Sequence, residues 1–562
     1  MKKLRWQLII IFLTGLVVGV LLLGEQPAVQ PNQTPQPVRG GIYTEALIGS
    51  MQRLNPVLDY TNPADHDINR LIFSGLLRFD DRGLPQSDMA ESWGVSKDGT
   101  LYNFTLQKGI HWQDGQPLTS DDVLFTIDLM RKGGNIVPDD LQSLWNGVKV
   151  VRLSNTTLQF QLPEPYAPFL DYLTFGILPK HLLNNLTFDQ VASAPFNLKP
   201  VGSGPYRFDH LLAENGQITG LILAAWDQYY GKKPFVEQIV FRFYTDGASA
   251  LQAYRDGAVQ GISEVPPDIL QACLAEANLS IYTGRKPQLS MVLFNLKNQD
   301  KAFLQEGDVR RALFMGINRQ KIVDQLLDGQ AVLADGPILP GTWAYYDGLR
   351  TQDFDPEGAK NMLIQAGYVH NTATDTVRKK DKVALDFTLL YPDDDLHKSI
   401  AVAIQKDWAN LNVQADLEAV PYDQLINDRL GQRSYDAALV DLNLFRTPDP
   451  DPYPFWDQAQ AASGQNYSQW DNRVASEYLE QARITVDLTE RTRLYRNFQV
   501  VFEEELPALP LYYPVYSYGV DKSVQGVRMS PLFDTSDRFA TILDWYFAVK
   551  RSTSAPTATP GK

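Results

Sequence analysis

Strand-like and helix-like segments alternate along residues 39–549 without a common period, and no long polar linker separates them. Residues 101–106 alternate apolar and polar side chains as a strand does, whereas Val123, Ile127 and Met130 repeat on one face of a helix. At roughly 150 residues per domain, a chain of 562 residues has room for three or four domains. We therefore expect an α/β protein whose lobes are built from interleaved segments.

The N-terminus carries three basic residues followed by an apolar run over residues 8–24. At about 1.5 Å per residue, a helix of this length just crosses a hydrocarbon core, and the basic flank stays in the cytoplasm. A cleavable signal sequence is the alternative, but no Ala-x-Ala site follows the run. We expect residues 1–24 to be a membrane anchor, residues 25–38 a Pro/Gln-rich stalk, and residues 549–562 a disordered tail. The remainder then lies outside the membrane.

Charge and residue usage exclude several classes of protein. Lys and Arg number 51 against 66 Asp and Glu, a net charge of −15, whereas nucleic-acid binding depends on Lys and Arg that neutralise phosphates. Cys273 is the single cysteine, and the six histidines lack the spacing of a metal site. We found no phosphate-binding glycine loop and no Gly-x-Ser-x-Gly motif. We expect no cofactor, no metal and no nucleic-acid partner.

The densest acidic segment is TPDPDPYPFW, residues 447–456. Asp449 and Asp451 lie beside aromatic residues there, an arrangement compatible with glycoside hydrolysis. The intervening prolines make the segment stiff and extended. Three interpretations stay open: a rigid loop with solvated carboxylates, a ligand-binding loop, and a catalytic pair.

Several segments, in a fixed order, resemble the extracytoplasmic solute-binding proteins of peptide-type ABC importers, the dipeptide/oligopeptide/nickel family (family 5). RGGIYTEALIGSMQRLNP (39–56) resembles the family's opening strand and its Leu-Asn-Pro, and "AESW", "KGIHWQDGQPLT" and "DDV" follow within residues 71–130. Further matching segments are VGSGPYRF (201–208), FNLKN (294–298), DVRRALFMGINRQKIV (308–323), GPILPGTWAYYD (336–347), DPEGAKNMLIQAGY (355–368), YDAALVDLN (435–443) and EELPALPLYYPVYSYGV (504–520). The resemblance covers about residues 39–548.

The resemblance implies a three-lobed α/β fold of the periplasmic-binding-protein type (type II, with an extra inserted lobe). A hinge joins two of the lobes, and the ligand cleft lies between them. The expected boundaries are lobe I at 39–82, 200–295 and 510–548, lobe II, inserted in it, at 83–199, and lobe III at 296–509. We expect the crossover segment Gly202, Ser203, Gly204 and Pro205 to supply hinge freedom, because glycine permits unusual backbone angles.

A protein that binds short peptides pairs the ligand ammonium with a carboxylate and the ligand carboxylate with Arg or Lys. In the peptide-binding relatives an aspartate after the "YDA" strand holds the amino terminus, and Asp441 is the nearest match. Asp449 is the alternative, because residues 444–447 delay the acidic-Pro pair. The predicted ligand-binding residues are Tyr60, Thr61, Asn62, Trp343, Tyr345, Asp441, Asn443, Arg446 and Asp449. An exposed turn is the alternative for residues 60–62, and core packing is the alternative for the two aromatics.

The sequence therefore predicts the substrate-binding component of an ABC importer, which captures oligopeptides or dipeptides and is not an enzyme. Its expected partners are short peptides, a permease with its ATPase subunits, and the membrane through the N-terminal helix, and the protein is expected to be a monomer. Asp441→Ala is expected to weaken peptide binding by about 2–5 kcal/mol. The alternatives are an oligosaccharide ligand, nickel as a less favoured ligand, and a stalked glycan or peptide hydrolase.

Overall fold

The computed structural model describes residues 37–370, 375–445, 448–529 and 531–548. The predicted anchor, all but the last two residues of the predicted stalk, Arg446 and the predicted tail lie outside the described residues. Among the helices that are described, none is both long and apolar enough to cross a membrane.

A mixed sheet of 12 strands runs through two lobes in the order β18-β17-β19-β13-β20-β11-β1-β10-β9-β8, and β12 and β14 also pair with β20. The strands are β18 (Gln414–Val420), β17 (Asp386–Pro392), β19 (Ala437–Asn443), β13 (Gln288–Phe294), β14 (Ala331–Leu333), β20 (Ala508–Asp521), β12 (Leu279–Arg285), β11 (Gly261–Ile262), β1 (Ile42–Ile48), β10 (Gln238–Tyr244), β9 (Gln217–Ala225) and β8 (Tyr206–Glu214).

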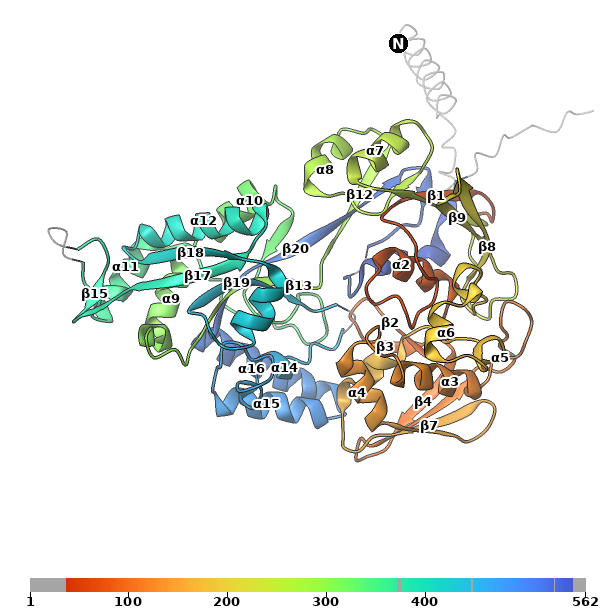
Figure 1. Ribbon diagram of the computed structural model, residues 1–562, viewed down its shortest axis with the longest axis horizontal. Coiled ribbons are helices and arrows are strands. Elements are labelled where there is room, and N and C mark those ends of the chain that lie inside the picture. Colours follow the sequence, from red (N-terminus) through yellow and green to blue (C-terminus); the bar gives the residue numbers. More distant parts are fainter. Residues whose placement is uncertain (1–36, 371–374, 446–447, 530, 549–562) are drawn as a thin grey trace, which may run out of the picture.

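Strand β20 belongs to both lobes (Figure 1). Its first half pairs with β13 and β14, and its second half pairs with β12 from Arg285↔Val515 onward. The chain also crosses between the lobes at residues 286–287, where Lys286 N–H donates a hydrogen bond of 2.7 Å to Pro514 C=O. Two adjacent crossings, at 286–287 and 514–515, therefore join lobe I to lobe III. The boundaries expected from the sequence, 295/296 and 509/510, lie eight residues after the first crossing and five residues before the second.

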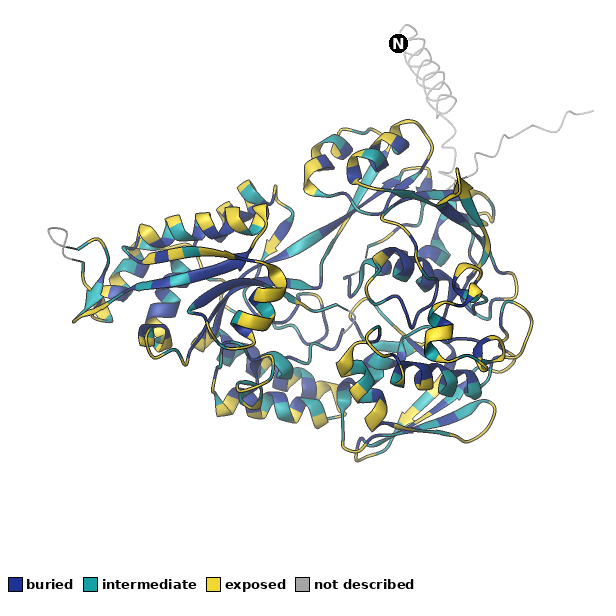
Figure 2. Cartoon of the chain, viewed as in Figure 1, coloured by how far each residue is buried: buried dark blue, intermediate teal, exposed yellow. Residues whose placement is uncertain are grey.

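Lobe III has a hydrophobic core of its own, formed by residues from Leu289 to Tyr513. Buried residues follow its central strands β13, β17 and β19, and exposed ones lie on the outer faces of its helices (Figure 2). The helices are α9 (Gly307–Met315), α10 (Arg319–Leu326), α11 (Pro356–Gln365), α12 (Asp395–Ala409), α13 (Tyr422–Gln424), α14 (Tyr453–Trp456), α15 (Arg473–Ile484) and α16 (Leu488–Glu505), and the short strands β15 (Lys379–Lys380) and β16 (Val383–Ala384) form a separate pair.

Lobe II is a four-stranded sheet, β4-β5-β7-β6, covered by short helices. Its elements are β4 (Ala90–Val95), β5 (Leu101–Leu106), α3 (Ser120–Arg131), α4 (Asp139–Gly147), β6 (Lys149–Arg152), β7 (Thr157–Gln161), η1 (Ala167–Leu173), α5 (Lys180–Leu183), α6 (Phe188–Ala192) and η2 (Pro195–Leu198). Its core is continuous with that of lobe I, whereas lobe III packs separately. Apolar burial therefore fixes lobe II to lobe I more firmly than either is fixed to lobe III.

The remaining elements of lobe I surround its part of the large sheet. They are α2 (Pro63–Ile72), the hairpin β2 (Leu77–Phe79) and β3 (Pro85–Ser87), α7 (Gly247–Arg255), α8 (Pro267–Leu274), β21 (Val524–Gln525), η6 (Thr535–Phe539), η7 (Ile542–Asp544) and β22 (Tyr546–Phe547). Helix α2 begins where the Asn62 side chain accepts hydrogen bonds from the N–H groups of Ala64 and Asp65, with Pro63 at the first helical position. It lies between the strands of lobe I and the β2–β3 hairpin (Figure 1).

Candidate functional site

A cleft of about 770 Å³ lies where the three lobes meet. Lobe I contributes residues from β1, α2 and the start of η6, and lobe II contributes residues from α4 and η1. Lobe III contributes Asn443 at the end of β19, the two residues after it, and the loop from Asp449 to Phe455. A cleft with walls on separately packed lobes changes shape when the lobes move, so a ligand bound there can favour one arrangement.

The walls of this cleft combine apolar side chains with many carboxylates. The acidic lining residues are Asp67, Asp140, Asp171, Glu264, Asp449, Asp451 and Asp534. Among the described lining residues, neither Lys nor Arg occurs, and His66 is the one basic side chain. Aromatic, proline and aliphatic residues make up most of the remaining walls. The cleft therefore suits a ligand that has apolar parts and hydrogen-bond donors.

A buried ionic network supports the cleft from the lobe I side. Arg538 contacts Glu45 at 2.8 Å and Asp67 at 2.7 Å, and the Arg538 and Glu45 side chains are 0% exposed. Tyr43 and Tyr518 each donate a hydrogen bond to the other Glu45 oxygen, at 2.9 and 2.7 Å. Burial raises the pKa of Asp67 to about 6, although Arg538 opposes that shift. The network holds the middle of α2 against strand β1 and helix η6.

Two carboxylates of the acidic segment are held by arginines of lobe III. Arg491 Nη1 lies 2.6 Å from Asp449 Oδ2, and Arg483 Nη2 lies 3.0 Å from Asp451 Oδ2. Burial raises the pKa of Asp451, while Arg483 lowers it. The carboxylates are therefore not solvated, which differs from the interpretation as a rigid loop with solvated carboxylates. Each also has a cationic partner already, which differs from the interpretation as a catalytic pair.

Lobe II contacts the same loop through Asp171 on η1. The Asp449 N–H donates a hydrogen bond of 2.6 Å to Asp171 Oδ2, and Tyr166 OH donates one of 3.4 Å to Asp451. Arg483 also lies over the rings of Tyr166 and Tyr453. Burial, together with neighbouring Asp449, raises the pKa of Asp171 well above its ordinary value. Lobes II and III therefore meet through polar contacts at one end of the cleft.

The structure brings three of the predicted binding residues to the cleft. Tyr60, Asn443 and Asp449 line it. Thr61 lies exposed beside it, and Asn62 forms the N-cap of α2, so the side chain of Asn62 is engaged by the helix. Their neighbour Pro63 also lines the cleft.

Asp441 lies inside lobe III and outside the cleft lining. Its carboxylate accepts hydrogen bonds from Ser290 Oγ and, at 2.6 Å, from Gln288 Nε2, and it lies 3.3 Å from His397 Nε2. Burial lowers the pKa of His397, but its bonds with Asp441 and Asp394 outweigh that and raise the pKa. Pairing of β19 with β13 sets Asp441 opposite Ser290, so the strand register determines these contacts.

The two predicted aromatics pack into lobe III. Trp343 is 4% exposed, with its ring 5.6 Å from that of Tyr495 and 5.0 Å from the Arg491 guanidinium. Tyr345 is half-buried against the same core. Neither residue lines the cleft. These positions match core packing, which was the sequence-based alternative to ligand binding for the two aromatics.

The Gly202–Pro205 segment lies at the junction of lobes I and II. Ser203 and Gly204 N–H both donate to Ile72 C=O, and an added Cβ at Gly202 would lie 2.0 Å from that oxygen. The glycines therefore permit a close approach to the end of α2. The crossings between lobes I and III lie elsewhere, at 286–287 and 514–515.

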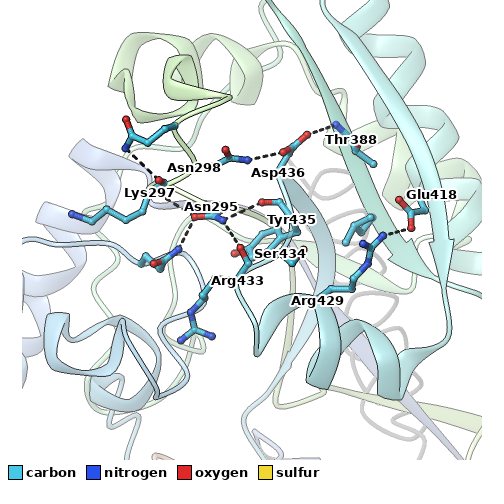
Figure 3. Close-up of a pocket in the computed structure, with 13 residues that line it drawn as sticks. Asn295, Lys297, Asn298, Thr388, Glu418, Arg429, Arg433, Ser434, Tyr435 and Asp436 are labelled. Carbon is cyan, nitrogen blue, oxygen red and sulfur yellow. Dashed lines mark hydrogen bonds and ion pairs between the residues drawn. The ribbon is translucent and has the colours of Figure 1, made fainter.

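A second cavity, of about 540 Å³, lies wholly in lobe III at the opposite end of its strands (Figure 3). Asn295 follows β13 there and Asp436 precedes β19, whereas Gln288 and Asn443 mark the cleft end. Its polar groups pair with one another: Asp436 accepts from Asn298 and from Thr388 N–H, and Arg429 pairs with Glu418. This cavity has no contact with a second lobe, so we place the functional site in the cleft.

Several cleft residues were not predicted from the sequence. They include Asp67 on α2, Asp171 and Tyr172 on η1, Phe445 and Phe455. Their local sequences carry no binding signal, because single Asp, Tyr and Phe residues of this kind occur on many helices and loops that bind no ligand. Among the described residues, no group of three or more His, Cys, Asp or Glu side chains is placed to hold a metal ion.

Solved structures share this fold. The oligopeptide-binding protein AppA from Bacillus subtilis, solved in complex with a nonapeptide, is 26% identical with a TM-score of 0.65, over 92% of this chain and 100% of that one. NikZ from Campylobacter jejuni, solved in complex with Ni(L-His), is 26% identical with a TM-score of 0.67, over 90% and 99% of the two chains. The fold and the cleft between lobes thus define an extracytoplasmic solute-binding protein.

Sequence comparison identifies the family. Residues 85–465 match "Bacterial extracellular solute-binding proteins, family 5 Middle", and the chain belongs to this family. The dipeptide-binding protein of Escherichia coli is 27% identical over 515 residues, which are 86% of this chain and 91% of that protein. The resemblance drawn from the ordered sequence segments is confirmed.

Proposed function

We propose that the chain captures oligopeptides or dipeptides outside the membrane and delivers them to an ABC permease whose ATPase subunits are separate chains. The cleft of about 770 Å³ at the junction of the three lobes is the observation that carries this proposal. The names of AppA and of the E. coli dipeptide-binding protein point to the same ligand class.

Tyr60 and Asn443 are the proposed ligand contacts from opposite sides of the cleft. Tyr60 precedes α2 in lobe I, and Asn443 ends β19 in lobe III. An aromatic face packs on a ligand side chain, and an amide both donates to and accepts from a peptide backbone. A ligand that touches both residues binds the closed arrangement better than the open one and shifts the population toward it.

Two strand crossings supply the proposed hinge. Residues 286–287 and 514–515 are adjacent, and few residues there need to change their backbone angles for lobe III to rotate. The Gly202–Pro205 segment is proposed instead as a joint that fixes lobe II to lobe I. The proposed lobe boundaries are accordingly 287/288 and 514/515 for lobe III.

The protein is proposed to be a membrane-anchored monomer without enzymatic activity. The apolar run at residues 8–24 supports the anchor. Intact mass of the protein extracted from membranes should retain residues 1–24, apart from the initiator methionine, and a chain that begins near residue 26 would contradict the anchor. Arg partners on Asp449 and Asp451 argue against a catalytic acid and base at that loop.

Native mass spectrometry of the purified protein, followed by denaturation, tests the ligand class. We expect retained short peptides, or equimolar binding of added peptides together with an increase in melting temperature. Retention of a single sugar series, with no response to peptides, would establish the oligosaccharide alternative. Cleavage of a bound peptide or glycan, lost in Asp449→Asn, would establish a hydrolase.

A further inference from the structure

Another cavity, distinct from the one in lobe III, continues from the cleft into lobes I and II. It has a volume of about 590 Å³ and is called the rear chamber here, defined by its lining from α2, η1, η6 and the β2–β3 hairpin. Tyr60, His66, Leu141, Asp171, Tyr172 and Asp534 line both the cleft and the rear chamber. These shared residues place the chamber directly behind the cleft.

Helix α2 separates the two spaces along its length. Pro63, Ala64 and Asp67 line the cleft, and Asn69 and Arg70 line the rear chamber. His66, Asn69 and Arg70 share one helix face, because residues three and four apart are neighbours on a helix. Figure 1 shows α2 above the β2–β3 hairpin.

Two buried polar atoms in the chamber lining lack a hydrogen-bond partner among the described residues. They are Asn69 Oδ1 and Ser536 Oγ, on side chains whose residues are 3% and 1% exposed. Asn69 Nδ2 donates a hydrogen bond of 2.9 Å to Asp59 Oδ2. This bond sets the orientation of the amide group and leaves Asn69 Oδ1 as the atom without a described partner. A buried acceptor without a donor is costly, so these atoms indicate a place for a ligand group that donates.

The remaining lining has apolar surface and more acidic than basic side chains. The acidic residues are Asp59, Asp88, Asp171, Asp534, Asp537 and Asp544, and the lysine and arginine residues are Arg70, Arg78 and Lys232. Phe73, Phe175 and Phe533 contribute apolar surface. The cations of the lining have partners of their own. Arg70 is paired with Asp537 at 3.2 Å, Lys232 is paired with Asp544, and Arg78 Nε donates to Ser87 C=O at 3.2 Å. A chamber that combines aromatic walls, an excess of carboxylates and unused acceptors suits a long methylene stem with a cationic head.

We propose that the rear chamber binds a basic side chain of the peptide, with its methylene stem along the aromatic wall and its ammonium or guanidinium group at Asn69 Oδ1 and Ser536 Oγ. This inference rests on the proposed function, since it assigns a part of the same ligand. It predicts a preference for a Lys or Arg residue at one position of the bound peptide.

Isothermal titration of the full chain with matched tripeptides tests the assignment. The probes are trialanine, the three tripeptides with one Lys among Ala residues, and the same three with norleucine in place of Lys. Norleucine keeps the carbon stem of lysine and lacks the ammonium. We expect one Lys position to bind at least about tenfold more tightly than its norleucine counterpart, as for one charge-assisted hydrogen bond. Equal binding of all Lys and norleucine pairs would overturn the inference.

Variants locate the preference in the rear chamber. Ser536→Ala removes the hydroxyl with little change of volume, and Asn69→Leu removes the acceptor. Each is expected to lower the Lys-to-norleucine ratio while trialanine binds as before. Ser87→Ala, at an exposed position of the same lining, is the control and should keep the ratio.

The variants also separate this inference from the proposed function. A Lys preference that survives both Ser536→Ala and Asn69→Leu would place the cation elsewhere and overturn the inference. If Asn69→Leu does not fold, Ser536→Ala alone decides. Absence of binding of every tripeptide would count against the peptide function itself, whereas trialanine binding without a Lys preference would remove the rear-chamber assignment alone.

Discussion

The Asp449 N–H of lobe III donates a hydrogen bond of 2.6 Å to the Asp171 carboxylate of lobe II. Asp449 keeps its own carboxylate for Arg491, so Asp171 is left beside a second acidic group without a cation of its own. A neutral Asp171 accepts the hydrogen bond without the cost of burying a charge. The contact between lobes II and III is therefore sensitive to the protonation of one side chain.

Asp171→Asn should make stability less dependent on pH. Because the pKa of Asp171 is raised in the folded protein by burial and by Asp449, its contribution is complete below the ordinary value of 3.8 and is lost as the pH rises through the raised pKa. Asn keeps an acceptor for the Asp449 N–H and carries no charge. In urea unfolding from pH 4 to pH 8, the free energy of unfolding of the variant should increase relative to that of the wild type as the pH rises. A difference that stays constant with pH would contradict this.

Arg491→Met should destabilise the protein by about 3–5 kcal/mol, because the Asp449 carboxylate would remain buried without its partner. The two side chains are 6% and 5% exposed, so solvent cannot replace the lost contact. Chemical denaturation measures the change. Arg493→Met, two residues along α16 at an exposed ion pair, is the matched control and should leave stability unchanged.

Gly202→Ala should destabilise the protein by about 1–3 kcal/mol, because the new methyl group would overlap Ile72 C=O at the junction of lobes I and II. Gly94→Ala is the matched control, since an added Cβ there meets no atom within 4 Å. Thermal melting compares the two. Equal melting temperatures would mean that the junction relaxes freely, as a hinge does.

Asn443→Ala should raise the dissociation constant of a bound peptide about three- to tenfold, as for one lost hydrogen bond in the cleft. Asp441→Ala should change it less than about threefold, because that carboxylate is occupied by Ser290, Gln288 and His397. Titration of both variants with one peptide gives the comparison. The reverse order would restore Asp441 as the amine anchor expected from the sequence.

Peptide binding should reduce the radius of gyration measured by small-angle X-ray scattering, since lobe III rotates toward lobe I about the crossings at 286–287 and 514–515. A cysteine pair that locks the lobes apart should abolish the change. An identical scattering curve with saturating peptide would argue against closure. Cys273 is buried, so it should not interfere with the introduced pair.

Local signals in the sequence predicted elements whose determinants lie within a few residues. The helix face predicted from Val123, Ile127 and Met130 appears as α3, which begins with a capping box of Thr119 and Asp122. The strand at residues 101–106 appears as β5. Ordered motifs along the chain also identified the family, because each is a contiguous run of residues.

Tertiary structure alone decided which of the candidate side chains face the cleft. Asp449 and Asp451 look available in the sequence, yet Arg491 and Arg483 from α16 and α15 neutralise them across a long stretch of chain. Trp343 was a candidate for stacking on a ligand, and the packing of α16 against it buried the ring. Asn69 gave no signal at all in the sequence. Burial and pairing depend on residues that are distant in sequence and adjacent in space, so the composition of a short segment cannot determine them.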